Sequence, residues 1–348
     1  DLTLREGVKF HNGDPLTAED AVASFKRIME MSPISGYYKE VESVEVVDDL
    51  TFRVNMKEPT NLMSSLKIQV TWQGIMPKEY AEQQEELKTD ELFGTGPYKL
   101  EEWQPGTKIV LTRFEDYKSP EGEASGFAGK KVPYLEEIVI NPVKEVGTRG
   151  AGLEKGKYDY AASLPTTKYN TIESAPNLVP KIVNGKWELV WELNHKEFPT
   201  NNVKFRQAIL AALDMEQVMS TVAMGNPKFY TVAPGIKFTP GSEWYSTAGS
   251  EYYNQSNIDK AKRLLDEAGY EGQDIVLLSN RDYYWMYRCT LAAASQLERA
   301  GIRVKLEFYD WNTQIGKALD MKNWNINQSG WSTTEEPLRL TSSVQCDA

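Results

Sequence analysis

The sequence predicts an α/β protein of about two domains, and three observations lead to that prediction. The chain has 348 residues, and roughly 100 to 200 residues per domain is usual. Segments with strand alternation and segments with helical periodicity follow one another along the chain. Residues 275–308 read as strand, helix and strand, a pattern typical of a right-handed βαβ unit with parallel strands. Mixed sheets that contain βαβ units are therefore expected.

The first half of the chain is predicted to hold paired strands around one long helix. Residues 1–10 alternate in the manner of a strand. Thr17 and Asp20 have the spacing of a capping box, and apolar residues then recur at helical spacing as far as Met29. The other expected elements are strands at residues 43–47, 51–54, 98–103, 108–113 and 135–140, a long loop at 118–133 and a short helix at 147–155.

The second half alternates strands and helices more regularly. The expected strands are residues 186–193, 275–279, 302–308 and 325–329, and the expected helices are residues 203–219, 258–268 and 284–300. Ser256 or Asn257 caps the second of these helices, and Gly269 ends it. Parallel sheets bind ligands beyond the carboxyl ends of their strands. The predicted binding edge is therefore made by the loops at residues 280–285 and 330–332.

Charge and the length of the apolar runs exclude two classes of partner. The chain has 39 Lys and Arg against 50 Asp and Glu, a net charge of −11, and no block of consecutive basic residues. Such a chain is poorly suited to bind nucleic acid or an anionic membrane. No apolar run reaches the ~18 residues that a membrane-spanning helix needs. A soluble protein without a nucleic-acid partner is expected.

Metal and nucleophilic chemistry have few residues to use. Cys289, Cys346, His11 and His195 cannot build a four-ligand zinc site, and the H-E-x-x-H spacing is absent. There is no G-x-S-x-G motif. The Gly-Thr-Gly-Pro segment at residues 94–97 precedes a strand rather than a helix, which favours a tight turn over a phosphate loop. We predict no metal, no cofactor and no catalytic residue, with a site made of carboxylates alone as the alternative. The count of cysteines leaves open whether they are bridged.

Aromatic side chains mark the candidate cleft. Tyr283, Tyr284, Trp285 and Trp331 lie in the two loops at the predicted binding edge. Trp and Tyr join a large apolar face to a polar atom, which suits them to line ligand clefts. The alternative is that Trp285 and Tyr287 pack the helix against the sheet. Glu335 and Glu336 follow Trp331 and are further candidates for ligand contact, whereas other acidic pairs are interpreted as solvated surface.

Several segments together resemble the large extracellular solute-binding proteins of ATP-driven importers, the family 5 or peptide/nickel-binding class. The matching segments are LREGVKFHNG at residues 4–13, LTAEDAV at 16–22, GTGPY at 94–98, NVKFRQAI at 202–209, the pairs Gln296-Leu297 and Gly301-Ile302, and Gly330-Trp331. They occur in the family's order over nearly the whole chain.

The resemblance implies a periplasmic-binding-protein-like fold of the cluster C type, with two lobes, a hinge and an extra subdomain in the first lobe. Residues 1–112 would be the inserted subdomain and the adjoining part of lobe 1, residues 113–188 the rest of lobe 1, and residues 189–348 lobe 2. No signal peptide is visible at the start, although the family implies one in the precursor. Both ends read as truncated, with sheet edge or apolar surface of the first lobe left uncovered.

The resemblance also implies ligand-binding residues. In peptide-binding relatives an Arg-x-Tyr loop helps to hold dipeptides, and here Arg281 and Tyr283 match it. An Asp shortly after the Gly-Trp pair holds the amino terminus of the ligand, but this chain continues with Ser332 and lacks that Asp. Either Glu335 or Glu336 takes over the contact, or the ligand has no free amine. The other residues expected at the pocket are Leu164, Tyr37 and Trp72.

The implied function is capture of a peptide or peptide-like solute between two lobes and its delivery to the membrane permease of an ABC importer. The protein would be a monomer and no enzyme, located in the periplasm or anchored outside the cell as a lipoprotein. Oligosaccharides or opine-like compounds are alternative solutes within the family. A carboxylate-dependent hydrolase on the same scaffold is the alternative from another class, and nickel-chelate binding is a distant third. The identity and length of the ligand stay open.

Overall fold

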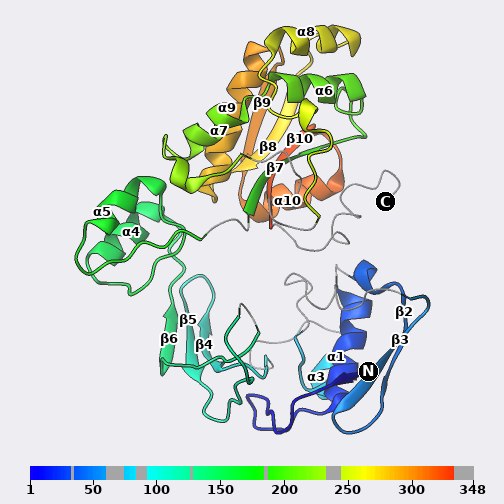
Figure 1. Ribbon diagram of the computed structural model, residues 1–348, viewed down its shortest axis with the longest axis vertical. Helices are drawn as coiled ribbons and strands as arrows, with labels where there is room; N and C mark the ends of the chain where they lie inside the picture. Colours follow the sequence, from blue (N-terminus) through cyan, green and yellow to red (C-terminus); the bar gives the residue numbers. More distant parts are fainter. Residues whose placement is uncertain are drawn as a thin grey trace. The chain divides into compact units, whose positions relative to one another are not determined.

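The computed structural model describes residues 1–32, 35–59, 74–83, 92–125, 128–183, 187–232 and 244–332. It divides into two compact units, Asp1–Pro142 and Val143–Val344 (Figure 1). The predicted start of the second lobe, residue 189, falls just inside a strand that begins at Trp187. None of the described helices is both long and apolar enough to cross a membrane.

Unit 1 begins with a helix packed on a three-stranded antiparallel sheet. The strands are β1 (Leu2–Thr3), β2 (Val41–Val46) and β3 (Thr51–Met56), in the order β1-β3-β2. The helix α1 (Ala18–Met31) buries Phe25 against Tyr38 of the short helix η1 (Ser35–Tyr38), with the ring centres 5.4 Å apart. The predicted hairpin and helix are confirmed. The predicted strand over residues 1–10 is mostly wrong, because it ends at Thr3 and Gly7 turns the backbone with φ +64°.

The capping box predicted at Thr17 is present and also ties α1 to α3 (Lys78–Ala81). Asp20 Oδ2 accepts hydrogen bonds from Thr17 N and Thr17 Oγ1, and Asp20 Oδ1 accepts one from Lys78 N. Asp20→Ala removes these acceptors, so the free energy of unfolding of unit 1 should fall by about 1 to 2 kcal/mol. Chemical denaturation measures this, with the exposed Glu30→Ala on the same helix as the control. Equal midpoints for the two variants would contradict the assigned role of Asp20.

A second antiparallel sheet of unit 1 has the order β4-β5-β6, with β4 (Tyr98–Gln104), β5 (Lys108–Arg113) and β6 (Glu137–Ile140). The turn before β4 is held by His11, which bonds the Gly96 carbonyl oxygen through Nε2 at 3.0 Å and accepts from Gly94 N at Nδ1. Burial lowers the pKa of His11, which suits this neutral imidazole. The interpretations of residues 94–97 as a structural turn and of His11 as a structural residue are confirmed.

Unit 2 contains a mixed four-stranded sheet in the order β7-β10-β8-β9. These strands are β7 (Trp187–Leu193), β8 (Ile275–Asn280), β9 (Val304–Tyr309) and β10 (Ile326–Ser332). The pairs β10-β8 and β8-β9 are parallel, whereas β10 and β7 are antiparallel. The predicted βαβ unit is therefore confirmed. Before β7, unit 2 contains α4 (Val146–Glu154), η4 (Thr166–Lys168) and α5 (Tyr169–Glu173), and after it the short helices η5 (Pro227–Phe229) and η6 (Ser250–Tyr252).

Helices cover both faces of this sheet (Figure 1). Ile275 and Leu277 of β8 pack in one core cluster with the helices of the first face. Leu278 alternates to the other face, where it packs with Ala318 and Trp324. The helices of the first face are α6 (Val203–Ala212), α7 (Met215–Val222), α8 (Ile258–Glu267) and α9 (Tyr284–Arg299), and the helix of the second face is α10 (Trp311–Asp320).

One helical prediction for this unit needs correction, and one helix was missed. The single helix expected over residues 203–219 is two helices, because Leu213 is extended and Asp214 caps a new helix by accepting from Gln217 N at 2.9 Å. The helix α10 was not predicted, although Asp310 has the position and type of an N-cap residue. The cap of α8 at Asn257 is confirmed.

Candidate functional site

The carboxyl ends of β8, β9 and β10 meet at one edge of the sheet because the three strands are parallel. Two loops at this edge are bonded to each other. Asn280 Oδ1 at the end of β8 accepts from Tyr283 N at 2.9 Å, and Asp282 Oδ2 accepts from Trp311 N at the start of α10 at 2.8 Å. The loop after β8 therefore has a fixed backbone, and it presents the side chains that sequence analysis singled out.

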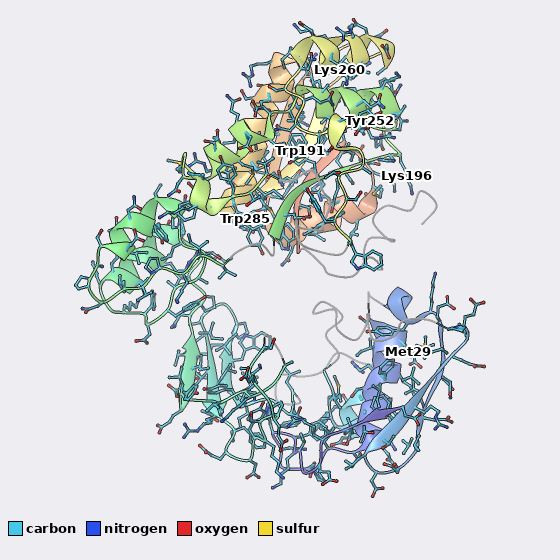
Figure 2. All side chains as sticks on the ribbon, in the orientation of Figure 1. Met29, Trp191, Lys196, Tyr252, Lys260 and Trp285 are labelled. Atoms are coloured by element: carbon cyan, nitrogen blue, oxygen red, sulfur yellow. The ribbon has the colours of Figure 1, made fainter. Side chains whose placement is uncertain are left out.

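Three aromatic rings gather at this edge. The ring of Tyr283 lies 5.4 Å from that of Trp285 and 5.3 Å from that of Trp311, the latter edge-to-face. Tyr283 is 38% exposed, whereas Trp285, labelled in Figure 2, is partly buried. A Cβ on Gly330 would lie 2.9 Å from Trp285 Cη2, so the glycine makes room for the indole. Trp285 thus packs helix α9 on β10 and also contributes to the cluster.

Arg281 and Tyr284 have partners within the unit. The guanidinium of Arg281 is exposed and lies over the rings of Phe308 and Tyr287, 5.2 and 5.7 Å from their centres. The hydroxyl of Tyr284 accepts a hydrogen bond from Arg288 Nη1 at 2.6 Å, one turn later on α9. Arg281 keeps its donors exposed beside the aromatic cluster, while Tyr284 is held along its own helix.

A row of buried amides runs from Asn280, at the end of β8, to Glu192 on β7. Asn280 Nδ2 donates to Gln314 Oε1 at 2.7 Å, and Gln314 Nε2 donates to Asn327 Oδ1 at 2.6 Å. Asn327 Nδ2 then donates to Glu192 Oε2 at 2.7 Å, and Trp331 Nε1 donates to Glu192 Oε1 at 2.7 Å. The three amides are fully buried. They fix the carboxylate of Glu192 and the indole of Trp331 relative to the end of β8.

Sequence reasoning missed Glu192, Gln314 and Asn327. The sequence of strand β10 contains a signal for them. This strand lies inside the sheet, yet its sequence, Ile-Asn-Gln-Ser-Gly-Trp-Ser, is largely polar. Buried polar groups need hydrogen-bond partners, so such a strand demands polar side chains from neighbouring elements. On the opposite face of β10, Gln328 Oε1 accepts from Trp191 Nε1 at 2.7 Å.

Of the remaining predicted site residues, Ser332 lies at this edge because it ends β10, whereas no described contact brings Leu164 or Tyr37 to it. Leu164 packs toward α4, where its Cδ2 lies 3.8 Å from the position of a Cβ on Gly150. Tyr37 belongs to η1, and Ser332 is the last residue of β10, but the structure does not describe their side chains. Trp72, Glu335 and Glu336 lie outside the described residues.

Cys289 is a buried free thiol on α9, and Cys346 lies outside the described residues. Burial raises the pKa of Cys289 to about 12, so the reactive thiolate is scarce at ordinary pH. In a Cys346→Ser background, iodoacetamide at pH 8 should leave the native protein unmodified and should label it once it is unfolded in urea. Mass spectrometry reads out both states, and rapid labelling of the native protein would contradict this placement of Cys289.

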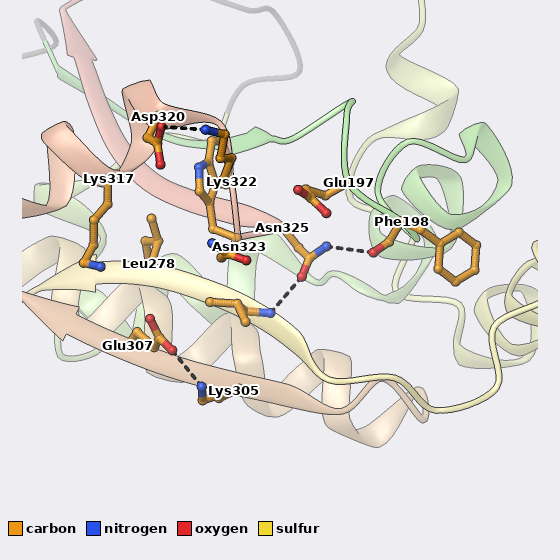
Figure 3. Close-up of a pocket in the computed structure, with 12 residues that line it drawn as sticks. Glu197, Phe198, Leu278, Lys305, Glu307, Lys317, Asp320, Lys322, Asn323 and Asn325 are labelled. Carbon is orange, nitrogen blue, oxygen red and sulfur yellow. Dashed lines mark hydrogen bonds and ion pairs between the residues drawn. The ribbon is translucent and has the colours of Figure 1, made fainter.

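A polar pocket of about 380 Å³ lies on the α10 face of the same sheet (Figure 3). Val276 and Lys305, near the starts of β8 and β9, line it, so it opens toward the amino ends of the parallel strands. Lys305 Nζ is paired with Glu307 Oε1 at 2.8 Å. Trp324 is buried there, and its Nε1 has no hydrogen-bond partner among the described residues. The residues that line this pocket do not include Tyr283, Trp285 or Trp311 of the aromatic cluster.

Comparison with known proteins places the chain in a family. The family model for bacterial extracellular solute-binding proteins, family 5, matches residues 1–339. A probable peptide ABC transporter periplasmic-binding protein of Sinorhizobium fredii is 28% identical over 94% of this chain and 62% of its own length. The oligopeptide-binding protein AppA of Bacillus subtilis is 26% identical over 97% of this chain and 63% of its own length. The chain thus spans less than two thirds of these relatives.

Solved structures show the same fold. A dipeptide-binding protein of Pseudoalteromonas in complex with Met-Leu has a TM-score of 0.81 at 23% identity, with 98% of this chain and 69% of the other chain covered. PBP AgaA of A. tumefaciens in complex with agropinic acid has a TM-score of 0.76 at 25% identity, with 94% and 64% covered. The predicted α/β periplasmic-binding-protein fold is therefore confirmed. With a model that matches residues 1–339, the chain belongs to the bacterial extracellular solute-binding proteins of family 5.

Proposed function

We propose that this protein is the substrate-binding component of an ABC importer and that it captures a peptide or peptide-like solute. The carboxyl edge of the unit 2 sheet supplies one side of the binding surface. The observation that carries the proposal is the convergence there of an aromatic cluster, at Tyr283, and a buried amide row that holds Glu192 and Trp331. The names of the two sequence relatives, both peptide-type binding proteins, support the peptide class.

The chemistry of this edge suits capture rather than bond cleavage. Aromatic faces bury apolar parts of a solute with little dependence on its sequence, at roughly 0.5 to 1.5 kcal/mol per favourable ring pair beyond the buried area. Both oxygens of Glu192 accept hydrogen bonds from fixed donors, which holds the carboxylate for recognition. A solute that contacts two lobes in the closed form shifts the open-closed equilibrium by its differential affinity. A membrane permease then reads the closed form.

We further propose that the protein is a monomer, acts in the periplasm or as an anchored lipoprotein outside the cell, and catalyses no reaction. We also propose the division into lobes that the sequence predicts, with residues 1–188 in lobe 1, the inserted subdomain within residues 1–112, and residues 189–348 in lobe 2. An opine-like solute is the second candidate, because a structure 25% identical to this chain binds agropinic acid.

Native mass spectrometry of protein purified without denaturation tests the proposal. We expect an extra mass from a small co-purified solute that leaves on unfolding and is recovered chemically unchanged. The same protein incubated with a peptide mixture should acquire peptide masses and produce no shorter fragments. Turnover of the mixture, or apo protein that acquires no mass from peptides or opines, would overturn the proposed function.

A further inference from the structure

The buried indole of Trp324 lies at the pocket on the α10 face of the unit 2 sheet. Trp324 lines this pocket and is 3% exposed, and its Nε1 has no hydrogen-bond partner among the described residues. Buried polar groups in folded proteins nearly always have a partner, because a group left unpaired carries the cost of its lost hydration. An acceptor brought by a ligand would give this N–H group its partner.

Two buried asparagines hold the turn that presents Trp324 to the pocket. Asn194 Nδ2 donates to the carbonyl oxygens of Met321 and Trp324, at 3.2 and 3.0 Å. Asn325 exchanges two hydrogen bonds with the backbone of Val276, at 2.9 and 3.0 Å. Met321 has a φ of +54°, and left-handed backbone at a residue with a side chain persists where its surroundings hold it, often at binding sites. The indole is therefore fixed in place before any ligand arrives.

The ammonium group of Lys317 is a second donor at this pocket. None of the ion pairs among the described residues includes Lys317, and its Nζ lies 4.7 Å from the centre of the Tyr309 ring. The carboxylate of Glu307, which also lines the pocket, already accepts from Lys305 Nζ and from the Tyr309 hydroxyl, both at 2.8 Å. Lys317 is therefore available to pair with an anion.

The lining of the pocket favours a ligand with one negative charge and an apolar part. Three lysines and three acidic residues line it, so no excess positive charge is present to balance a dianion such as phosphate. Glu197 lies on the other side of the pocket from Lys317 (Figure 3), where it repels a second negative charge. Val276 and Leu278 add apolar surface. A carboxylate with a small hydrocarbon part fits this combination.

We propose that the pocket is a second ligand site, which binds a small monocarboxylate through Trp324 Nε1 and Lys317 Nζ. The indole N–H and the ammonium are both donors, and a hydrogen bond between an ammonium and a carboxylate is stronger than one between neutral groups. Binding here does not depend on capture of the solute at the carboxyl edge. Because the ligand binds the folded state, it also stabilises unit 2 against unfolding.

Nuclear magnetic resonance of the indole N–H groups tests this on the full chain grown with isotope-labelled tryptophan. Sequential assignment of the unaltered protein identifies the Trp324 signal. At least one of butyrate, hexanoate and benzoate should shift this signal until it saturates, and the matching neutral amide should leave it in place.

Four other outcomes of this titration would overturn the second site. They are no shift with any of the three carboxylates, an equal shift with the amide, and an equal shift with chloride or phosphate at the same ionic strength, which would mean an adventitious ion only. The fourth is a shift confined to Trp285 and Trp331, which would place the carboxylate at the carboxyl edge.

A pair of lysine variants assigns the charge to Lys317. Lys317→Met keeps the length of the side chain and should weaken carboxylate binding by about fivefold or more. Lys262→Met removes the same charge from an exposed site on α8 and should bind the carboxylate normally. The same titration measures the affinities, melting curves check that both variants fold, and both should capture the solute normally. Unchanged carboxylate affinity in Lys317→Met would overturn the assignment.

Discussion

Gln314→Leu should lower the free energy of unfolding of unit 2 by about 3 kcal/mol or more. Gln314 is fully buried and forms three hydrogen bonds, from Asn280 Nδ2 and to Asn327 Oδ1 and the Gln328 carbonyl oxygen. Leucine has a similar size but no polar atom, so all three partners lose a bond inside the protein. Each buried group left without a partner costs about 1 to 3 kcal/mol. Denaturant titration followed by circular dichroism measures the change.

The same substitution should also weaken solute binding, because Asn327 loses the partner that holds it against Glu192. The exposed Asn312→Leu on the same helix is the matched control, and it should change stability by less than about 0.5 kcal/mol. If Gln314→Leu were as stable as this control, the amide row would have no structural role.

Gly330→Val should destabilise unit 2 by about 3 kcal/mol and disturb the aromatic cluster. A Cβ at Gly330 would lie 2.8 Å from Met286 Cε and 2.9 Å from Trp285 Cη2, inside contact distance, and valine adds two methyl groups. Met286 is itself 1% exposed, so neither side chain has free space to move into. Overpacking of this kind typically costs about 1 to 3 kcal/mol. Thermal denaturation and Trp fluorescence report the two effects.

Gly316→Ala provides the control for Gly330→Val. Gly316 lies exposed on α10 with nothing within 4 Å of an added Cβ. Alanine has the higher helix propensity, so this variant should be more stable by up to about 1 kcal/mol. A Gly330→Val protein with unchanged stability and unchanged fluorescence would show that Trp285 does not pack against β10 as described.

Most of the fold could be predicted because its elements have strong local signals. The helix after Thr17 has a capping box. In the βαβ unit, apolar residues recur every second position in the strands and about every 3.6 positions in the helix. The division between α6 and α7 was missed because the apolar period continues across it, and only the extended Leu213 and the Asp214 cap separate the helices. The prediction of a strand over residues 1–10 was wrong because alternation of apolar and polar residues does not by itself provide a neighbouring strand to pair with.

The position of the candidate site could be predicted from the sequence, but the contacts between its side chains could not. The rule that ligands bind at the carboxyl ends of parallel strands directed attention to Tyr283 and Trp331. Glu192 is distant in sequence from both, and only the antiparallel pairing of β7 with β10 places it beside Trp331. A register of this kind depends on long-range pairing, which no local pattern specifies.

The most direct test of the central claim is a crystal structure of the protein with its captured solute. We predict density for the solute at the carboxyl edge of the unit 2 sheet, in contact with Trp331 and the Tyr283 cluster. Solute bound elsewhere, such as in the pocket beside Trp324, with the carboxyl edge empty, would contradict the account.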